Sequence, residues 1–408
     1  MPKIVPEQTS ALAGVRVLDL SRVLAGPWAT QILGDMGADV IKIEKPGRGD
    51  DTRAWGPPFL PNPKGGHGDA AYYLAANRNK RSVTIDFAKP EGADIIRSLA
   101  PHCQILVENF KTGGLARYGL DYAAISKINP AMVYCSITGF GQTGPYAHRP
   151  GYDYMIQAMG GLMSLTGEPE GEPMKSAVAV ADLFTGMYAV TAILAALRHA
   201  ERTGEGQHLD VSLLDCQVAM LANLGASFLM NGQPPTRYGN QHAAIAPYQV
   251  FATLDGHIVL TVGNDGQFRD FCRAAGLALA DDPRFASNEA RVTHRAELTA
   301  ALAPAMRARA TSDWVRDLAA AEVPCGPINT LDQVYADPQV MSRGAVEAMT
   351  RADGRKVSLA ASPIRMSRTP PNPRAAPPLL GQDTEAVLAE MLSASPDDLA
   401  GWKASRVI

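Results

Sequence analysis

The segment VRVLDLSRVLAGPWATQILGDMGADVIKIE, residues 15–44, decides the fold of this 408-residue chain. Its apolar ends, Val15–Leu20 and Asp39–Glu44, predict two strands. Pro27 marks the first turn of a helix between them, which stops at Gly37. A strand, a helix and a strand in this order form a βαβ unit, which pairs its strands in parallel. Because strands and helices alternate through the first 200 residues, we predict an α/β fold with helices covering a mostly parallel sheet.

The composition is that of an ordinary globular protein, with 46% hydrophobic and 19% charged residues. A net charge of −3 gives no basic field, so we expect neither nucleic acid nor a membrane as a partner. No apolar run reaches the length of a membrane span, and the first ten residues lack the layout of a secretory signal. The five cysteines have no CxxC spacing, which predicts no disulfide scaffold, no metal site and a cytoplasmic location.

The sequence pattern changes after residue 229. Residues 248–262 predict a β-hairpin followed by helices, so we expect residues 230–325 to form a small α+β domain. Residues 1–229 then form the first part of a large domain, and residues 326–408 return to it and wrap its surface. A second hairpin is predicted within residues 346–360 of that return.

Two basic loops are candidates for phosphate binding. Lys45–Arg53 follows a predicted strand, and Asn77–Arg81 leads into another, predicted at Val83–Phe87, so each loop lies beside a strand end, where α/β folds bind ligands. A solvated charged face is the alternative interpretation of such runs. No GxGxxG joins the first strand to its helix, which disfavours a nicotinamide or flavin bound in the usual Rossmann manner.

Asp182 is the one acidic residue at the start of a long apolar helix that includes Leu183, Met187 and Val190. Aspartate is a preferred N-cap, so we predict that Asp182 caps this helix. A carboxylate there gains from the helix dipole and from free N–H groups, which predicts that it is ionised near neutral pH. Capping alone accounts for an aspartate at this position, and a functional role needs support from the rest of the chain.

Segments spread over nearly the whole chain provide that support. In order they are residues 15–53, NRNKRS, VENF, YCSITGFGQTGP, GYDYMIQAMGG, ADLFTGMYA, VPCGPIN and PPLLGQDT. Together these segments resemble the family III CoA-transferases (CaiB/BaiF family). The resemblance implies a Rossmann-like large domain built from both chain ends, an inserted small domain, and two ring-like subunits interlocked as a homodimer. It implies no permanently bound cofactor, because coenzyme A or its acyl thioester is the substrate.

The resemblance also implies which residues act. The nucleophilic aspartate of the family aligns with Asp182, and Lys45 and Arg117 suit the phosphates of CoA. A glycine-bearing loop that moves in relatives corresponds to the region of Gly239. The implied CoA-contacting residues are Leu24, Ala25, Lys45, Ile85, Asp86, Phe87, Ala88, Asn109, Phe110, Lys111, Arg117, Arg149, Pro150, Gly151 and Tyr152.

The reaction that the resemblance implies moves CoA from an acyl-CoA donor, expected to be succinyl-CoA, to a carboxylic acid, expected to be a dicarboxylic acid, through an aspartyl anhydride and an aspartyl-CoA thioester. The segments GDDTRAWGPPF, YCSITGFGQTGP and HAAIAPYQVF look most like members that move CoA from succinyl-CoA to other dicarboxylates, such as hydroxymethylglutarate or glutarate. A second substrate carboxylate needs a cation, and Arg22, Arg53 and His242 are candidates, with ordinary surface pairing as the alternative.

Three other functions stay open on the sequence. The first is an α-methylacyl-CoA racemase, although Tyr152 stands where the racemases have a histidine, and a tyrosine with a pKa of ~10 is a poor base for an α-proton. The second is a transferase of the formyl-CoA:oxalate type. The third is a CoA-binding scaffold without catalysis, against which the intact Asp182 and Arg117 argue.

Overall fold

The computed structural model describes residues 10–62 and 65–408. Its largest element is a six-stranded sheet with the order β5-β2-β1-β6-β7-β8, in which every neighbouring pair is parallel. The predicted α/β fold with a mostly parallel sheet is confirmed. The strands are β1 (Arg16–Asp19), β2 (Asp39–Glu44), β5 (Lys80–Thr84), β6 (Ile105–Glu108), β7 (Val133–Thr138) and β8 (Gln207–Ser212).

The strand order reverses direction between β1 and β6, which lie side by side at the centre of the sheet. Loops after two such strands part to opposite faces, so a crevice opens between them at the carboxyl edge. One strand differs from the sequence prediction. The expected strand Val83–Phe87 lies earlier, at Lys80–Thr84, because the buried Lys80 is paired with Asp19 inside the sheet and so does not break it.

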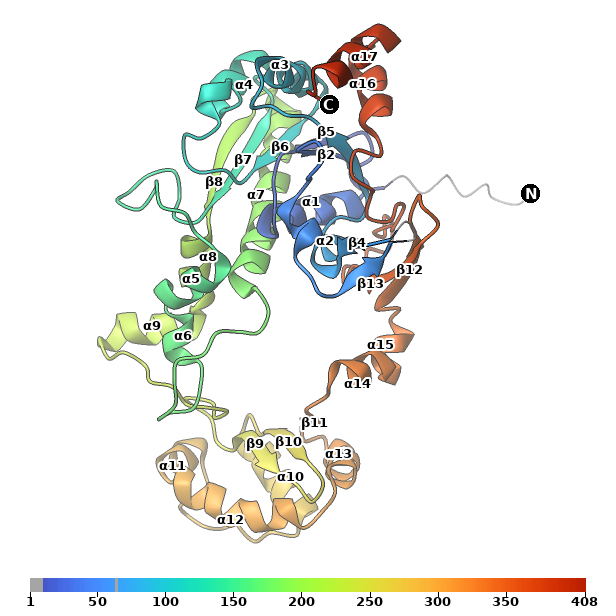
Figure 1. Ribbon diagram of the computed structural model, residues 1–408. Coiled ribbons are helices and arrows are strands. Elements are labelled where there is room, and N and C mark those ends of the chain that lie inside the picture. The colour runs from blue at the N-terminus through green and yellow to red at the C-terminus, as the bar shows by residue number, and fades with distance from the viewer. Residues whose placement is uncertain (1–9, 63–64) are drawn as a thin grey trace, which may run out of the picture. The chain divides into compact units, whose positions relative to one another are not determined.

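Helices cover both faces of the sheet (Figure 1). On one face, α1 (Ala25–Asp35) and α7 (Val180–Thr203) share a core with Val17 and Val40. On the other, α3 (Pro90–Leu99), α4 (Tyr122–Ile128) and α16 (Thr384–Leu392) share a core with Leu18 and Ile41. Neighbouring residues of each strand therefore serve opposite cores, as the period of two requires.

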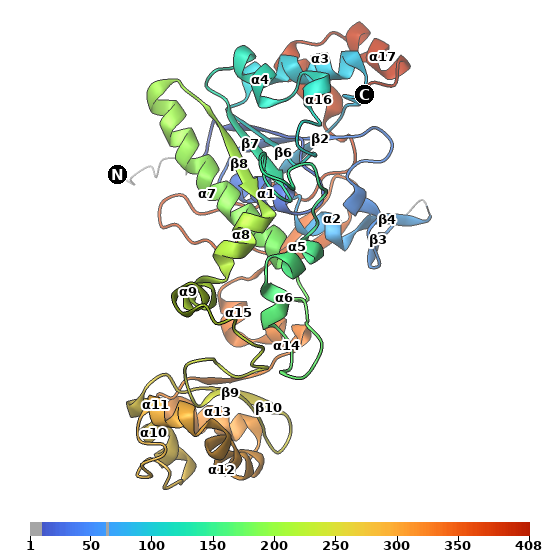
Figure 2. The same ribbon diagram turned by 90° about the vertical axis from the view of Figure 1, so that its left-hand side faces the viewer.

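The helix α7 corrects one expectation. It has 24 residues and is long and apolar enough to cross a membrane by length and composition, although the sequence was expected to contain no such run. Some of its apolar side chains join the protein core, where Ala181, Ala189 and Ile193 are fully buried. Figure 2 shows α7 running beside the sheet along β7 and β8. At Gly186 a Cβ would come within 2.8 Å of the Ala25 carbonyl oxygen, so α7 and α1 approach closely there.

The chain divides into two compact units. Of the described residues, the larger comprises 10–62, 65–162, 175–232 and 341–408, so segments from both parts of the chain build it. The smaller comprises residues 163–174 and 233–340. It therefore runs further than the expected range 230–325 and includes an early segment that the sequence pattern did not separate from its surroundings.

Each unit also carries the short elements that the sequence pattern located as hairpins. The pairs β9 (Tyr248–Ala252) with β10 (His257–Thr261), and β12 (Val346–Thr350) with β13 (Lys356–Ala360), are antiparallel, which confirms both predicted hairpins. The further elements of the larger unit are η1 (Asp51–Ala54), β3 (Phe59–Pro61), β4 (His67–Ala70), α2 (Ala71–Ala75), η2 (Ala100–His102), η3 (Ala116–Tyr118), α5 (Asp153–Met159), α8 (Leu213–Met220), α9 (Ala222–Asn231), α15 (Pro338–Ser342, at its border) and α17 (Pro396–Ala404). Those of the smaller unit are α10 (Asp265–Ala275), α11 (Asn288–Thr293), α12 (Arg295–Arg307), α13 (Thr311–Ala320), β11 (Cys325–Pro327) and α14 (Leu331–Ala336), with α6 (Leu162–Leu165) at its border.

Candidate active site

A cavity of about 790 Å³ opens at the crevice between β1 and β6. Asp182, from the first turn of α7, lies on its wall. The turn between β1 and α1 forms a second wall, and the loop after β6 forms a third. The lining residues are Arg22, Val23, Leu24, Ala25, Phe87, Asn109, Phe110, Lys111, Thr112, Gly113, Gly114, Arg117, Tyr118, Ile137, Thr138, Gly139, Ala147, His148, Arg149, Pro150, Gly151, Tyr152, Asp182 and Leu213.

The turn after β1 is held from the side of β6. The Asn109 amide accepts a hydrogen bond from the Arg22 backbone N–H at 2.8 Å and donates one to the Arg22 carbonyl oxygen at 2.6 Å. The helix α1 then begins at Ala25, and no side chain in the described residues caps it at Leu24. The first N–H groups of a helix lack partners within the helix and favour an anion. Because Leu24 and Ala25 line the cavity, this helix start faces the same space as Asp182.

Asp182 is not the N-cap of α7. The helix begins at Val180, so Asp182 is its third residue, and its side chain makes no cap hydrogen bond. The cap is supplied from α5 by Asp153, whose Oδ1 accepts hydrogen bonds from the N–H groups of Ala181 at 2.8 Å and Asp182 at 3.3 Å. The N–H groups that were expected to stabilise Asp182 are thus occupied by another carboxylate.

The protonation of Asp182 is the second correction. Burial, together with the negative charge of Asp153, raises the pKa of Asp182 from 3.8 to about 7. The carboxyl is therefore about half protonated at neutral pH rather than fully ionised. Burial and the charges of Asp182 and Asp153 also raise the pKa of Tyr72 to about 12, which keeps its hydroxyl protonated and able to donate a hydrogen bond.

Two glycines bring the loop after β7 against the segment before α5. A Cβ on Gly139 would lie 2.6 Å from the Gly151 Cα, and a Cβ on Gly151 would lie 2.5 Å from the Gly139 Cα. Only two residues without side chains permit this approach. The contact fixes Arg149–Tyr152 on the cavity wall, with Tyr152 64% exposed.

A second cavity, of about 260 Å³, lies at the ends of β2 and β5 and shares Arg22, Phe87 and Phe110 with the first. Lys45 and Arg48 bring positive charge to its lining. The residues that line it are Leu20, Arg22, Lys42, Ile43, Glu44, Lys45, Arg48, Gly49, Asp50, Asp51, Ile85, Asp86, Phe87, Ala88 and Phe110. An elongated ligand could therefore occupy both cavities, with one end near Lys45 and Arg48 and the other near the Asp182 carboxyl.

Comparison with known proteins identifies the family. Residues 12–384 match CoA-transferase family III. The chain belongs to this family. The succinate–glutarate CoA-transferase of Agrobacterium fabrum is 52% identical to it over 392 residues, which cover 95% of this chain and 97% of that protein. The succinyl-CoA:glutarate CoA-transferase of Mus musculus is 44% identical over 382 residues, covering 93% and 86%. The crystal structure of a CAIB/BAIF family protein from Brucella suis has a TM-score of 0.85 at 48% identity, covering 94% of this chain and 100% of that one.

In this family III CoA-transferase, every residue expected to contact CoA lines one of the two cavities. Lys45, Ile85, Asp86 and Ala88 line the smaller one, Phe87 and Phe110 line both, and the rest line the cavity of Asp182. The structure thus brings together positions that are far apart in the sequence. Their contacts with CoA stay predictions.

The three candidate cations for a second substrate carboxylate have different surroundings. Arg53 is only 7% exposed, and its guanidinium donates to both carboxylate oxygens of Glu44, at 2.6 and 2.8 Å, so it has no capacity for a substrate. Arg22 lines both cavities and forms an exposed ion pair of 3.2 Å with Asp51. His242 lies in the smaller unit, where its ring contacts Tyr248. Gly239, the residue of the expected mobile loop, also belongs to the smaller unit.

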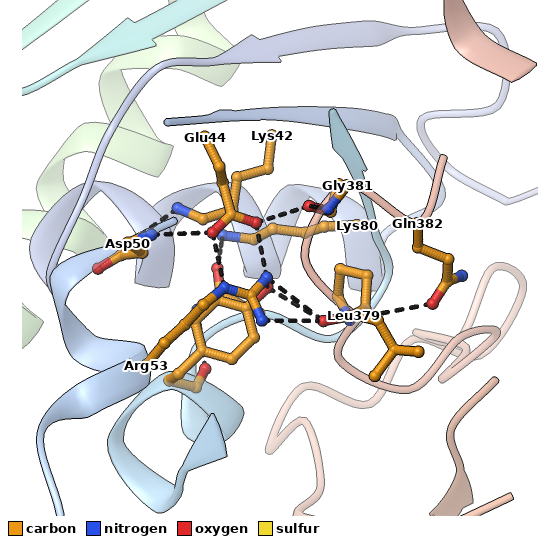
Figure 3. Close-up of polar contacts among 12 residues, drawn as sticks. Lys42, Glu44, Asp50, Arg53, Lys80, Leu379, Gly381 and Gln382 are labelled. Atoms are coloured by element: carbon orange, nitrogen blue, oxygen red, sulfur yellow. Dashed lines mark hydrogen bonds and ion pairs between the residues drawn. The ribbon is translucent and has the colours of Figure 1, made fainter. Parts of the chain in front are cut away.

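Sequence reasoning missed three features around the candidate site: the capping Asp153, the neighbouring Tyr72, and a buried cluster of charges behind the turn after β1. Figure 3 shows part of this cluster, in which Lys42 points toward Asp50 and Arg53 toward Glu44. The only sequence signal was charge inside otherwise apolar strands, such as Lys42 in VIKIE. A charged residue is almost never buried unless it is paired, so the sequence indicates that Lys42 has a partner but does not identify that partner.

Proposed function

We propose that this CoA-transferase moves CoA from succinyl-CoA to a dicarboxylic acid, and that glutarate is an acceptor. The names of its most similar relatives support this assignment, since they pair succinate or succinyl-CoA with glutarate or mesaconate. The observation that carries the proposal is the Asp182 carboxyl on the wall of the 790 Å³ cavity, opposite an uncapped helix start and within a set of residues expected to contact CoA.

The proposed reaction begins with the ionised Asp182. Its carboxylate attacks the thioester carbonyl of succinyl-CoA, forming a mixed aspartyl–succinyl anhydride and releasing CoA thiolate. The thiolate then attacks the aspartyl carbonyl, which gives an aspartyl-CoA thioester and free succinate. The acceptor carboxylate attacks this thioester, forming a new anhydride and releasing the thiolate again. Attack of the thiolate on the acceptor's acyl carbon yields the product thioester and regenerates the Asp182 carboxylate.

The chain's own groups suit these steps. Each attack builds negative charge on a carbonyl oxygen, and the N–H groups at the start of α1, where Leu24 and Ala25 line the cavity, are suited to stabilise that charge. Lys45 in the smaller cavity and Arg117 in the larger one are suited to the CoA phosphates. A carboxylate nucleophile leaves the chain of intermediates near thermoneutral, because one activated acyl group is exchanged for another at every step.

We also propose that the protein is a homodimer, interlocked as its family resemblance implies. Large apolar side chains stand exposed on α5, α7, α8 and α9 of the larger unit, with Leu229 83% and Met230 87% exposed. The helices α5, α7 and α8 contact one another and α9 contacts α8, and large apolar side chains exposed together on neighbouring helices are typical of an interaction site. The other exposed members are Tyr154, Met159, Phe184, Met187, Tyr188, Val218 and Phe228.

A panel of acids tests the assignment. Purified protein is incubated with succinyl-CoA or acetyl-CoA and glutarate, mesaconate, oxalate or a monocarboxylate, and the CoA products are identified by mass spectrometry. We expect glutaryl-CoA from succinyl-CoA, and an adduct on the peptide ADLFTGMYAV after trapping with hydroxylamine. Exchange of an α-hydrogen in deuterated buffer without CoA transfer would instead establish the racemase alternative. CoA transfer to oxalate alone would refute the proposal that glutarate and similar dicarboxylates are acceptors.

A further inference from the structure

The turn that carries the start of α1 holds a strained residue. Val23 has a φ of 70°, in the left-handed region, where a β-branched side chain collides with its own backbone. Such a conformation persists only where the surroundings determine it. Val23 lies between Arg22 and Leu24 on the cavity wall, so a relaxation of its backbone would move the start of α1 relative to Asp182.

The buried ion pair of Lys42 and Asp50 forms hydrogen bonds with this turn at two points. The Lys42 ammonium, fully buried, donates hydrogen bonds to the Ser21 carbonyl oxygen at 2.9 Å and to Asp50 Oδ2 at 3.0 Å. The Asp50 carboxylate, 2% exposed, accepts from the Val23 N–H at 3.2 and 3.3 Å. The pair therefore holds the carbonyl before Arg22 and the N–H after it, while the Asn109 amide holds Arg22 itself.

Further hydrogen bonds connect this ion pair to the sheet and to the C-terminal segment of the chain. Glu44 Oε2 accepts the Asp50 N–H at 2.9 Å, and Thr52 donates to Asp50 Oδ1 from its hydroxyl at 2.8 Å. The Ser82 hydroxyl links Glu44 to Gly381, donating to Glu44 Oε1 at 2.7 Å and accepting the Gly381 N–H at 2.9 Å. Figure 3 shows Lys42, Glu44, Asp50 and Gly381 in this arrangement. A buried pair with every partner satisfied specifies one geometry.

We propose that Lys42 and Asp50 are positioning residues for CoA transfer, which hold Val23 in its strained conformation and so keep the start of α1 facing Asp182. The inference rests on the proposed role of Asp182. Neither side chain touches the reacting atoms in this arrangement, and both act through the backbone of the turn.

Asp50→Asn tests the inference, because the amide keeps the shape of the carboxylate but loses its charge and one acceptor oxygen. We expect kcat to fall about 5- to 150-fold, the factor that corresponds to releasing one strained backbone conformation, with a smaller change in KM for the acyl-CoA. Adding Val23→Gly should restore part of kcat, since glycine adopts a φ of 70° without strain. A purely structural role for Asp50 predicts no such rescue.

Asp35→Asn is the matched control. Asp35 and Arg78 form another buried ion pair, with side chains 3% and 6% exposed, at the far end of α1. We expect this variant to lose stability and keep kcat. If Asp50→Asn does not fold, Thr52→Val removes one donor from the same carboxylate and decides the matter. A fall in kcat that Val23→Gly relieves supports the inference, and an unchanged kcat overturns it.

Hydrogen exchange separates this inference from the proposed function. Amides of residues 20–30 should exchange faster in Asp50→Asn than in the wild type, and at the wild-type rate in Asp35→Asn. This readout needs no substrate, so a wild-type protein that transfers no CoA would refute the function while leaving the positioning role testable. Unaltered exchange in residues 20–30 of Asp50→Asn refutes the positioning role.

Discussion

Replacing Asp182 by asparagine should remove CoA transfer and, at alkaline pH, stabilise the protein. The native carboxyl has a pKa raised from 3.8 to about 7 by burial and by Asp153. One pKa unit corresponds to about 1.4 kcal/mol, so holding Asp182 ionised costs on the order of 4 kcal/mol of folding free energy above pH 7. Asparagine has a similar shape and carries no charge, so the variant is free of this cost.

The direction in which wild-type stability changes with pH follows from proton binding to Asp182. Between pH 3.8 and about 7 the native state keeps the Asp182 proton and the unfolded state has released it, so wild-type stability falls as the pH rises through this window. The stability of Asp182→Asn relative to the wild type should therefore be smallest near pH 4 and largest above pH 8. Urea unfolding of both proteins at pH 4.5, 6, 7 and 8.5 measures this difference, and mass spectrometry of CoA products measures transfer.

A matched control variant shows whether the pH effect is specific to position 182. Asp215→Asn removes an acidic side chain from the first turn of a different helix, α8, and its stability relative to the wild type should not follow the pH window of Asp182. Two results would refute the reasoning about Asp182. One is a constant difference in stability between Asp182→Asn and the wild type at all four pH values. The other is CoA transfer by Asp182→Asn at more than about a thousandth of the wild-type rate, since a lost nucleophile costs several powers of ten.

Three further perturbations have defined outcomes. Asp153→Asn keeps an oxygen for the Ala181 N–H but removes a charge that raises the pKa of Asp182, so the acidic limb of the kcat–pH profile should shift to lower pH; an unmoved limb contradicts this. Arg117→Ala should raise KM for succinyl-CoA about tenfold and change kcat little, and steady-state kinetics that show only a kcat effect would exclude a phosphate contact. Gly186→Ala places a methyl group 2.8 Å from the Ala25 carbonyl oxygen, so thermal unfolding should show a loss of about 1–3 kcal/mol, whereas wild-type stability would mean that α1 and α7 can separate.

The fold was largely predictable from local patterns. The apolar strands and the helix of residues 15–44 determine a βαβ unit through their spacing alone, and both hairpins follow from alternation around a turn. The strand at Lys80–Thr84 was misplaced because its charges argue against burial. Burial is possible because the Lys80 ammonium pairs with Asp19 and also donates to the Pro27 carbonyl oxygen and the Asn77 side chain, and a local sequence pattern does not report the long-range partners.

The resemblance named residues that the structure places on the walls of two cavities, and their contact with CoA stays a prediction, whereas the electrostatics of these cavities could not be predicted. The resemblance assigned positions from Leu24 to Asp182, and the parallel sheet brings them to one edge because strand ends gather there. Arg53 was a reasonable candidate for a substrate cation until Glu44 proved to occupy it. Which cation pairs with a buried carboxylate depends on the folded geometry, and residue type alone does not decide it.

Two effects compete at Asp182, and their magnitudes explain why the sequence prediction of an ionised carboxylate was wrong. A carboxylate in the first turn of a helix gains about 0.3–2 kcal/mol from the dipole. Burial and Asp153 act in the opposite direction with about 4 kcal/mol, and Asp153 also occupies the two N–H groups nearest to Asp182. The larger effect prevails. A carboxylate that is poorly solvated is a stronger nucleophile than one satisfied by N–H donors, and with a pKa of about 7 a large fraction of it is ionised at neutral pH. Asp153 caps α7 in place of Asp182, and in the reaction proposed above this leaves the Asp182 oxygens available to the thioester.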